Sequence, residues 1–227
     1  MAEVPWSSAV KRPANLASDT SARTLLSHPR VEQFSTSRLE LFIARDFLPR
    51  EACAALIELI DRERSASIVT DSNGDPYFRT SETCDLASAS SPLITAIDAV
   101  LSAFSGIDPA YGEPLQGQRY AVGQEFKPHT DYFEPTGANF ARLCSIIGNR
   151  TWTFMIYLND VEAGGETRFE AIEETVWPAT GTMLAWNNRR PDGSPNPDTV
   201  HQGTKVRAGV KYIVTKWYRE KPSEFTQ

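Results

Sequence analysis

The sequence is poor in cysteine, in positive charge and in long apolar runs, and each shortage narrows what the chain can do. Its three cysteines, Cys53, Cys84 and Cys144, are odd in number and far apart. They form no Cys-x-x-Cys pair, so the sequence supports neither a zinc ribbon nor a disulfide framework and predicts reduced, packed thiols. Lysine and arginine number 23 against 29 aspartates and glutamates, a net charge of −6. This balance lacks the positive excess that neutralises phosphates, so we expect no nucleic-acid partner.

No apolar run approaches the roughly 18 residues that a membrane-spanning helix needs. The segment Met1–Leu16 lacks the apolar centre of a secretory signal peptide. We therefore expect no membrane partner and a reducing, cytoplasmic location. The 227 residues, 41% of them hydrophobic and 23% charged, have the length and composition of one globular domain.

The first half of the chain indicates an extension followed by helices. Residues 1–37 are rich in Ser, Ala, Thr and Arg without a sustained period, which predicts a loosely ordered N-terminal extension before a domain of residues 38–227. Two helices are expected, at Pro49–Arg64 and Pro92–Phe104. Each begins with proline in its first turn and continues with apolar residues at helical spacing. They would form a helical support over about residues 46–106.

Short β-rich runs between turn signals fill the second half, from about residue 115 to residue 220. The runs are Gln118–Val122, Thr151–Leu158, Thr167–Phe169, Thr182–Trp186 and Val210–Tyr218. Helices followed by strands predict an α+β fold, mainly β, in which a helical layer supports a β-sandwich or barrel. Gly164-Gly165 predicts a hairpin turn, and the Asn-, Pro- and Arg-rich segment Asn187–Thr199 predicts a long loop of the kind that often borders a site.

Only three histidines occur, His28, His129 and His201. His129 and Asp131 form a His-x-Asp pair, and on a strand two side chains at this spacing point to the same face. A second imidazole must come from elsewhere, and His201 lies in the β-rich half, whereas His28 lies in the extension without a partner signal. Two imidazoles and one carboxylate on one face form the ligand set of non-haem Fe(II) oxygenases. The His-x-Asp pair alone is a weak motif, because it often arises by chance.

A lysine and a tyrosine accompany these candidate ligands. Lys211 follows His201 by ten residues, and Tyr120 precedes His129 by nine. A 2-oxoglutarate dioxygenase needs a buried cation for the far carboxylate of its cosubstrate. A lysine on a neighbouring strand supplies that charge, and a tyrosine hydroxyl adds a hydrogen bond.

Taken in order, these blocks resemble the prolyl 4-hydroxylase group of Fe(II)/2-oxoglutarate dioxygenases. The blocks that carry the resemblance are Arg119–Phe133, Thr153–Phe169 and Val200–Trp217, with weaker support from Asp46–Pro49 and Arg79–Ser81. The resemblance implies a double-stranded β-helix (jelly roll) with helices packed outside. It also implies Fe(II) as cofactor, 2-oxoglutarate and O₂ as cosubstrates, and ascorbate as a reductant.

The resemblance further assigns roles to single residues. It implies an iron held by His129, Asp131 and His201. The other implied contacts are Lys211 and Tyr120 to the cosubstrate, Thr153 as a polar contact to it, and Trp217 as a wall of the substrate cavity. Trp186 is a further candidate for the cavity lining, and Arg142 or Arg168 for a contact to a substrate carboxylate or peptide carbonyl. Lys216 is out of phase with Lys211, so we expect it to face the other side of the strand and to be solvated.

The implied reaction is hydroxylation of an aliphatic C–H, foremost in a prolyl residue of a protein or peptide, with release of succinate and CO₂. Hydroxylation of a free amino acid or another small molecule uses the same residues and stays open. A metal-binding jelly roll without oxygenase activity is disfavoured, because it has no use for Lys211 at this spacing. A nucleic-acid-repair dioxygenase is disfavoured because its relatives generally use arginine at that place. The sequence leaves the oligomeric state open, with a homodimer allowed for.

Overall fold

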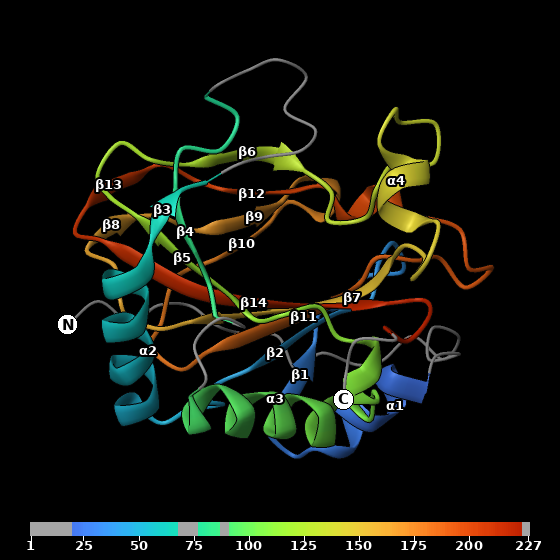
Figure 1. The fold of residues 1–227 in the computed structure, drawn as a ribbon, viewed down its shortest axis with the longest axis horizontal. Helices are drawn as coiled ribbons and strands as arrows, with labels where there is room; N and C mark the ends of the chain where they lie inside the picture. The colour runs from blue at the N-terminus through green and yellow to red at the C-terminus, as the bar shows by residue number, and fades with distance from the viewer. Residues whose placement is uncertain (1–19, 68–76, 87–90, 224–227) are drawn as a thin grey trace.

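Two antiparallel β-sheets form the centre of the computed structural model, which describes residues 20–67, 77–86 and 91–223 (Figure 1). The larger sheet has the strand order β1-β2-β11-β7-β14-β5-β4-β3, the smaller one has the order β10-β9-β12-β6, and β13 and β8 form a separate pair. The two sheets lie face to face, and helices α1, α2 and α3 pack outside the larger one (Figure 1). This arrangement confirms the predicted double-stranded β-helix with supporting helices.

The element bounds are as follows. The strands are β1 (Val31–Gln33), β2 (Leu41–Ala44), β3 (Ser65–Ala66), β4 (Glu82–Asp85), β5 (Gln116–Tyr120), β6 (Phe126–His129), β7 (Arg150–Tyr157), β8 (Ala163–Gly164), β9 (Thr167–Phe169), β10 (Glu174–Val176), β11 (Met183–Asn187), β12 (His201–Gly203), β13 (Val206–Ala208) and β14 (Lys211–Arg219). The helices are α1 (Thr20–Ser27), α2 (Arg50–Glu63), α3 (Pro92–Ser105) and α4 (Phe140–Cys144), with short 3-10 turns at Pro109–Tyr111, Glu170–Ile172 and Pro197–Thr199.

Strands β7 and β11, near the centre of the larger sheet, are buried on both faces, which explains why most of their residues are apolar. On β7, Trp152 and Phe154 belong to a core shared with the helices, whereas Met155 and Tyr157 belong to a core between the two sheets. Alternation along a strand produces this division. The larger sheet thus separates an outer core from an inner core, and the candidate site described below lies on the inner side.

The structure confirms both predicted helices. α2 buries Cys53, Leu56 and Ile60 on one face, and α3 begins at Pro92 and has the same kind of apolar face. Gly106 ends α3 with a φ of 70°, a left-handed conformation that glycine adopts without steric cost. These two helices have 14 residues each, and within the described ranges no helix is long and apolar enough to cross a membrane.

Part of the expected N-terminal extension belongs to the folded body. Residues 1–19 lie outside the described residues, but residues 20–37 contain α1 and β1. Ala22 and Leu25 of α1 are fully buried in the outer core, and β1 pairs with β2 at the edge of the larger sheet. A helix of eight residues gains its stability from tertiary packing, so its own sequence gives little signal.

The five predicted strands are present, with ends shifted by at most two residues. The sequence analysis missed the other nine strands that the structure describes, which are short: β1, β2, β3, β4, β6, β8, β10, β12 and β13. It was wrong about Gly164-Gly165, which forms no hairpin turn: Gly164 pairs with β13, and the chain then crosses to β9 in the smaller sheet. Both glycines have a positive φ, and a Cβ on Gly164 would lie 2.1 Å from the carbonyl oxygen of Lys205. The motif therefore permits a close crossing of two backbone segments.

The expectation that Lys216 is solvated is also wrong. It faces away from Lys211, as the alternation of the strand requires, but it is buried under α3 rather than solvated. Its Nζ lies 2.8 Å from Oδ1 of Asp98. The sequence could not reveal this pairing, because it depends on how α3 packs across β14.

Candidate metal and cosubstrate site

Strands β6 and β12 bring the three predicted metal ligands together. His129 ends β6, His201 begins β12, and the two residues are direct partners in the antiparallel pairing. One ligand atom from each of His129, Asp131 and His201 lies within 4.8 Å of the other two. The Nε2 atoms of His129 and His201 lie 3.9 Å from different oxygens of the Asp131 carboxylate. The three side chains therefore face one point.

Hydrogen bonds determine which nitrogen of each imidazole can bind a metal. Nδ1 of His129 lies 2.8 Å from the carbonyl oxygen of Lys127, and Nδ1 of His201 lies 2.9 Å from that of Thr199. A carbonyl oxygen only accepts, so each Nδ1 donates its hydrogen and each Nε2 keeps its lone pair. Ligating histidines in proteins are oriented in this way.

Two neutral side chains orient the Asp131 carboxylate. The Thr153 hydroxyl donates to Asp131 Oδ2 at 2.8 Å, and Asn188 Nδ2 donates to Thr153 Oγ1 at 2.9 Å. A hydroxyl has one hydrogen, and that of Thr153 goes to the carboxylate, so the direction of donation runs from Asn188 through Thr153 to Asp131. All three side chains are buried. This chain of donors holds the carboxylate in place.

The electrostatics favour the protonation states that a metal requires. Burial, aided by the neighbouring His201, lowers the pKa of His129 to about 3. Burial alone would raise the pKa of Asp131, but His201, His129, Arg150 and the Thr153 hydrogen bond outweigh it and lower that pKa. At neutral pH the His129 imidazole is therefore neutral and the Asp131 carboxylate is charged. Two imidazoles and one carboxylate on one side fit a divalent iron whose other positions serve cosubstrates.

Lys211 lies on the wall of the same cavity. It begins β14 opposite Tyr120 on β5 and is 2% exposed. Its Nζ lies 5.2 Å from the ring centre of Tyr120 and 5.4 Å from that of Tyr157. Burial lowers the pKa of Lys211 to about 7, and among the described residues only the charge of Glu166 counteracts this shift. An ammonium held against aromatic faces in this way suits an incoming carboxylate.

The cavity lining joins predicted and unpredicted residues. The predicted ones are His129, Asp131, His201, Lys211, Tyr120, Trp217 and Trp186. The sequence analysis missed Arg79, Gln118, Phe126, Met155, Thr167, Gly203, Ile213 and Thr215. The alternation of side chains along a strand could have identified several of them. Every second residue after Lys211 shares its face of β14, and Gln118 shares the face of Tyr120 on β5.

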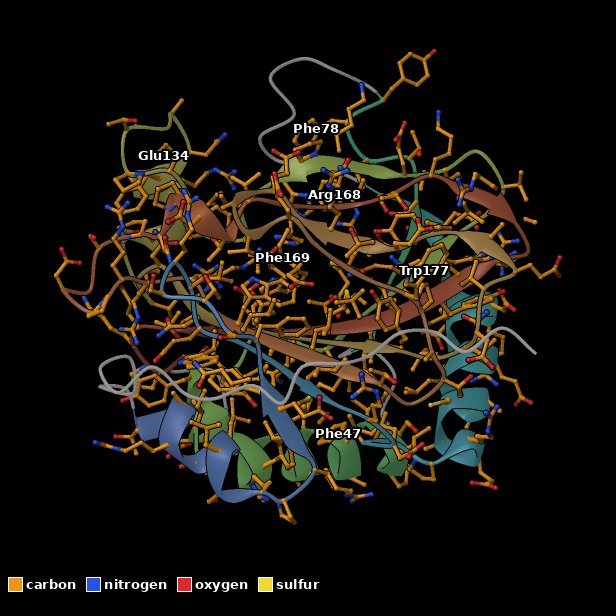
Figure 2. The ribbon with its side chains drawn as sticks, turned by 180° about the vertical axis from the view of Figure 1, so that it is seen from behind. Phe47, Phe78, Glu134, Arg168, Phe169 and Trp177 are labelled. Atoms are coloured by element: carbon orange, nitrogen blue, oxygen red, sulfur yellow. The ribbon has the colours of Figure 1, made fainter. Side chains whose placement is uncertain are left out.

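Three predicted contacts are not among the residues that line this cavity. The Thr153 hydroxyl is engaged with Asp131, so Thr153 supports the metal site rather than the cosubstrate. Arg142 is exposed on α4, where its Nη2 donates to Asn139 Oδ1 at 3.3 Å. Arg168 is exposed on β9 between the buried Thr167 and Phe169 (Figure 2). Neighbouring residues on a strand face opposite ways, so Arg168 faces away from the cavity.

A partly buried ion pair supports the Trp217 wall of the cavity. The Arg150 guanidinium donates to both carboxylate oxygens of Glu113, at 2.7 and 2.8 Å, and lies over the Trp217 ring at 4.0 Å. Burial would raise the pKa of Glu113, but Arg150 and Arg219 lower it and keep the carboxylate charged. The sequence could not reveal this role of Glu113, because its partners Arg150 and Arg219 lie on β7 and β14, far from it along the chain.

Comparison with known proteins agrees with this geometry. Residues 115–219 match the family model of the 2OG-Fe(II) oxygenase superfamily. The matched segment, which contains His129, Asp131, His201 and Lys211, belongs to that superfamily.

Curated relatives point within the superfamily to prolyl 4-hydroxylases. The chain is similar to prolyl 4-hydroxylase subunit alpha-1 of Gallus gallus, with 34% identity over 152 residues that cover 66% of this chain and 29% of the relative. It is also similar to subunit alpha-3 of Mus musculus, with 31% identity over 205 residues that cover 88% of this chain and 38% of the relative. The chain thus spans about a third of the length of these relatives.

Solved structures share the fold. A viral collagen prolyl hydroxylase from Paramecium Bursaria Chlorella virus-1, in its 2OG complex, has a TM-score of 0.62 at 24% identity and covers 79% of this chain and 94% of that one. A prolyl hydroxylase from Trichoplax adhaerens, in complex with a hypoxia inducible factor oxygen degradation domain peptide fragment, has a TM-score of 0.61 at 12% identity. That match covers 88% of this chain and 90% of the other.

Proposed function

We propose that this protein is an Fe(II)- and 2-oxoglutarate-dependent dioxygenase that hydroxylates a prolyl residue of a protein or peptide and releases succinate and CO₂. One observation carries the proposal: the ligand set His129, Asp131 and His201 lines the same cavity as the buried Lys211. The two histidines and the aspartate would hold the iron. When bound there, Fe(II) supplies the activation of O₂ that oxidises an aliphatic C–H.

The other residues of the site bind and orient the cosubstrate and substrate. Lys211 holds the far carboxylate of 2-oxoglutarate, and this contact favours the charged form of the lysine. Tyr120 lies against Lys211 on the same wall and adds a hydroxyl. Trp186 and Trp217 line the cavity with apolar surface and exclude water from it. None of these tasks requires a group outside the cavity lining.

The relatives support a peptide substrate. The curated proteins that the chain resembles are prolyl 4-hydroxylase subunits, and the Trichoplax adhaerens prolyl hydroxylase was solved with a peptide fragment. The three free, buried cysteines support the expected reducing location. Ascorbate belongs to the proposal as a reductant that keeps the iron in the ferrous state.

The test is succinate formation by anaerobically purified protein supplied with Fe(II), 2-oxoglutarate, O₂ and ascorbate. We expect a prolyl peptide to stimulate succinate formation at least about tenfold over the same peptide with alanine in place of proline. Stimulation by a free amino acid alone would replace the peptide substrate by a small molecule. Succinate formation that no candidate substrate stimulates, with iron bound, would contradict the proposal.

A further inference from the structure

Gly203 lines the metal cavity together with Lys211, and neither its backbone nor its neighbours require a glycine. It lies on strand β12 and its φ is not positive, so the backbone there accepts an ordinary side chain. A Cβ on Gly203 would lie 3.6 Å from Nζ of Lys211 and 3.8 Å from Cβ of Phe126, which are ordinary van der Waals separations. The fold therefore does not account for the missing side chain.

The strand that carries Gly203 also carries a metal ligand. His201 and Gly203 are two residues apart on β12, and both line the metal cavity. Their partners on β9 are Phe169 and Thr167, in regular register. Two residues of a strand span roughly 6.4–6.8 Å, which is of the order of the length of an extended five-carbon diacid. Strand β12 thus runs beside the space between the metal ligands and Lys211.

Other groups already cover much of the Lys211 side chain. The rings of Tyr120 and Tyr157 lie 5.2 and 5.4 Å from its Nζ. A Cβ on Gly165 would lie 3.2 Å from its Cδ, a tighter contact than packed side chains normally make. At the position of a Cβ on Gly203, in contrast, the nearest heavy atom of the described residues, chain neighbours aside, is Nζ itself. The room beside the ammonium group is therefore on the Gly203 side.

We propose that Gly203 is a specificity-determining residue for the cosubstrate: the space left by its missing side chain takes the far carboxylate of 2-oxoglutarate at Lys211. This inference rests on the proposed function and adds a residue to it. An ammonium and a carboxylate meet at about 2.7–2.9 Å. A methyl group 3.6 Å from the same nitrogen would compete with the carboxylate for that space.

The cosubstrate then lies along β12, with its 2-oxo acid end near His201 and its far carboxylate beside Gly203. A side chain at position 203 would leave the metal end of the cavity unchanged and fill the lysine end. It would therefore act against 2-oxo acids that carry a second carboxylate and spare those that do not. This selectivity distinguishes a cosubstrate role of Gly203 from a general effect on the fold.

The experiment measures binding to the full chain loaded with Mn(II), by calorimetry without O₂, so that no turnover occurs. The probes are 2-oxoglutarate and 2-oxobutyrate, a 2-oxo acid that lacks the second carboxylate. Gly203→Ala adds a single methyl group, and Gly203→Val adds more volume in a residue that strands favour. Gln202→Ala is the matched control, because Gln202 is the preceding residue of β12 and pairs with Arg168, which faces away from the cavity. Thermal unfolding and Mn(II) affinity report the fold and the metal site of each variant.

We expect Gly203→Ala to bind 2-oxoglutarate at least about tenfold more weakly than the wild type, and Gly203→Val to bind it more weakly still. Its affinities for 2-oxobutyrate and Mn(II) should stay within about twofold of the wild type, and Gln202→Ala should match the wild type throughout. Unchanged 2-oxoglutarate binding in Gly203→Ala, or an equal loss for both probes or for Mn(II), would overturn the role of Gly203 alone. A wild type that binds Mn(II) but not 2-oxoglutarate would overturn the proposed dioxygenase together with this inference.

Discussion

Strand β14 carries two buried lysines on opposite faces, and their surroundings differ. Lys216 faces α3, where Asp98 supplies a carboxylate 2.8 Å from its Nζ. Lys211 faces the inner cavity, where its Nζ lies beside the rings of Tyr120 and Tyr157 and its pKa falls to about 7. Burial alone therefore does not identify a functional cation. The useful distinction is whether the protein itself provides the opposite charge.

The same distinction separates the two faces of the larger sheet. The outer face packs against helices, and its buried lysine, Lys216, finds a carboxylate partner within the protein. The inner face has charged and polar groups that line a cavity together with the metal ligands. We therefore expect substitutions on the inner face to change activity more than stability and those on the outer face to do the reverse.

The largest effect on activity is expected for Asp131→Ala. Loss of the carboxylate removes one of three metal ligands, so succinate formation should fall more than about a hundredfold. The fold should persist, because both cores are built from other residues. Thermal unfolding without added metal serves as the control for folding. A variant that folds and still turns over normally would refute the iron assignment.

Lys211→Met should impair the use of 2-oxoglutarate while making the folded protein more stable. The 2-oxoglutarate concentration required for half-maximal activity should rise about a hundredfold, since a buried charge partner of the cosubstrate is lost. The free energy of unfolding should increase, because a buried cation without a carboxylate partner is replaced by an apolar side chain. Steady-state kinetics and urea unfolding check the two effects. An unchanged cosubstrate requirement would mean that another cation binds it.

Thr153→Val should weaken the metal site without removing a ligand. The variant keeps the shape of the side chain but leaves Asp131 without its hydroxyl donor, so the affinity for Mn(II), used as a redox-stable probe, should fall about tenfold. Thr153→Ser keeps the hydroxyl and should retain most of the affinity. Equal calorimetric affinities for the two variants would show that the hydroxyl does not orient the carboxylate.

The stability contributed by Lys211 should depend on pH with a defined sign. Its pKa of about 7 in the folded chain lies below the ordinary value of 10.5, so between these values the unfolded chain binds more protons. The free energy of unfolding of the wild type should therefore rise with pH relative to Lys211→Met, by up to about 1.4 kcal/mol per pH unit. Below pH 7 the difference should be constant. Urea unfolding at pH 6, 7, 8 and 9 measures it, and a pH-independent difference would contradict the lowered pKa.

The smallest effect on activity is expected for Lys216→Met, the outer counterpart of Lys211→Met. Asp98 loses its partner but remains about a third exposed, so the free energy of unfolding should fall by roughly 1–3 kcal/mol. The 2-oxoglutarate requirement should stay within about twofold of the wild type. A large rise in that requirement would remove the contrast between the two faces.

The sequence alone predicts the elements and residues whose signal is local. The two helices, five strands and the set His129, Asp131, His201 and Lys211 follow from spacing and from the family resemblance. It does not predict contacts between distant segments, such as the hydrogen bond from Thr153 to Asp131 or the ion pair of Arg150 with Glu113. It also leaves open which way Arg168 faces, because one residue of strand phase decides whether a side chain enters the cavity, and the structure exposes Arg168.

The direct pairing of His129 with His201 has a consequence for how the protein folds. A slip of one residue between β6 and β12 would turn one imidazole to the opposite face of the smaller sheet. A metal ion that needs both imidazoles would bind only the correctly paired sheet and would stabilise it by mass action. Metal supply during synthesis would then raise the yield of correctly folded chains, besides making them competent for catalysis.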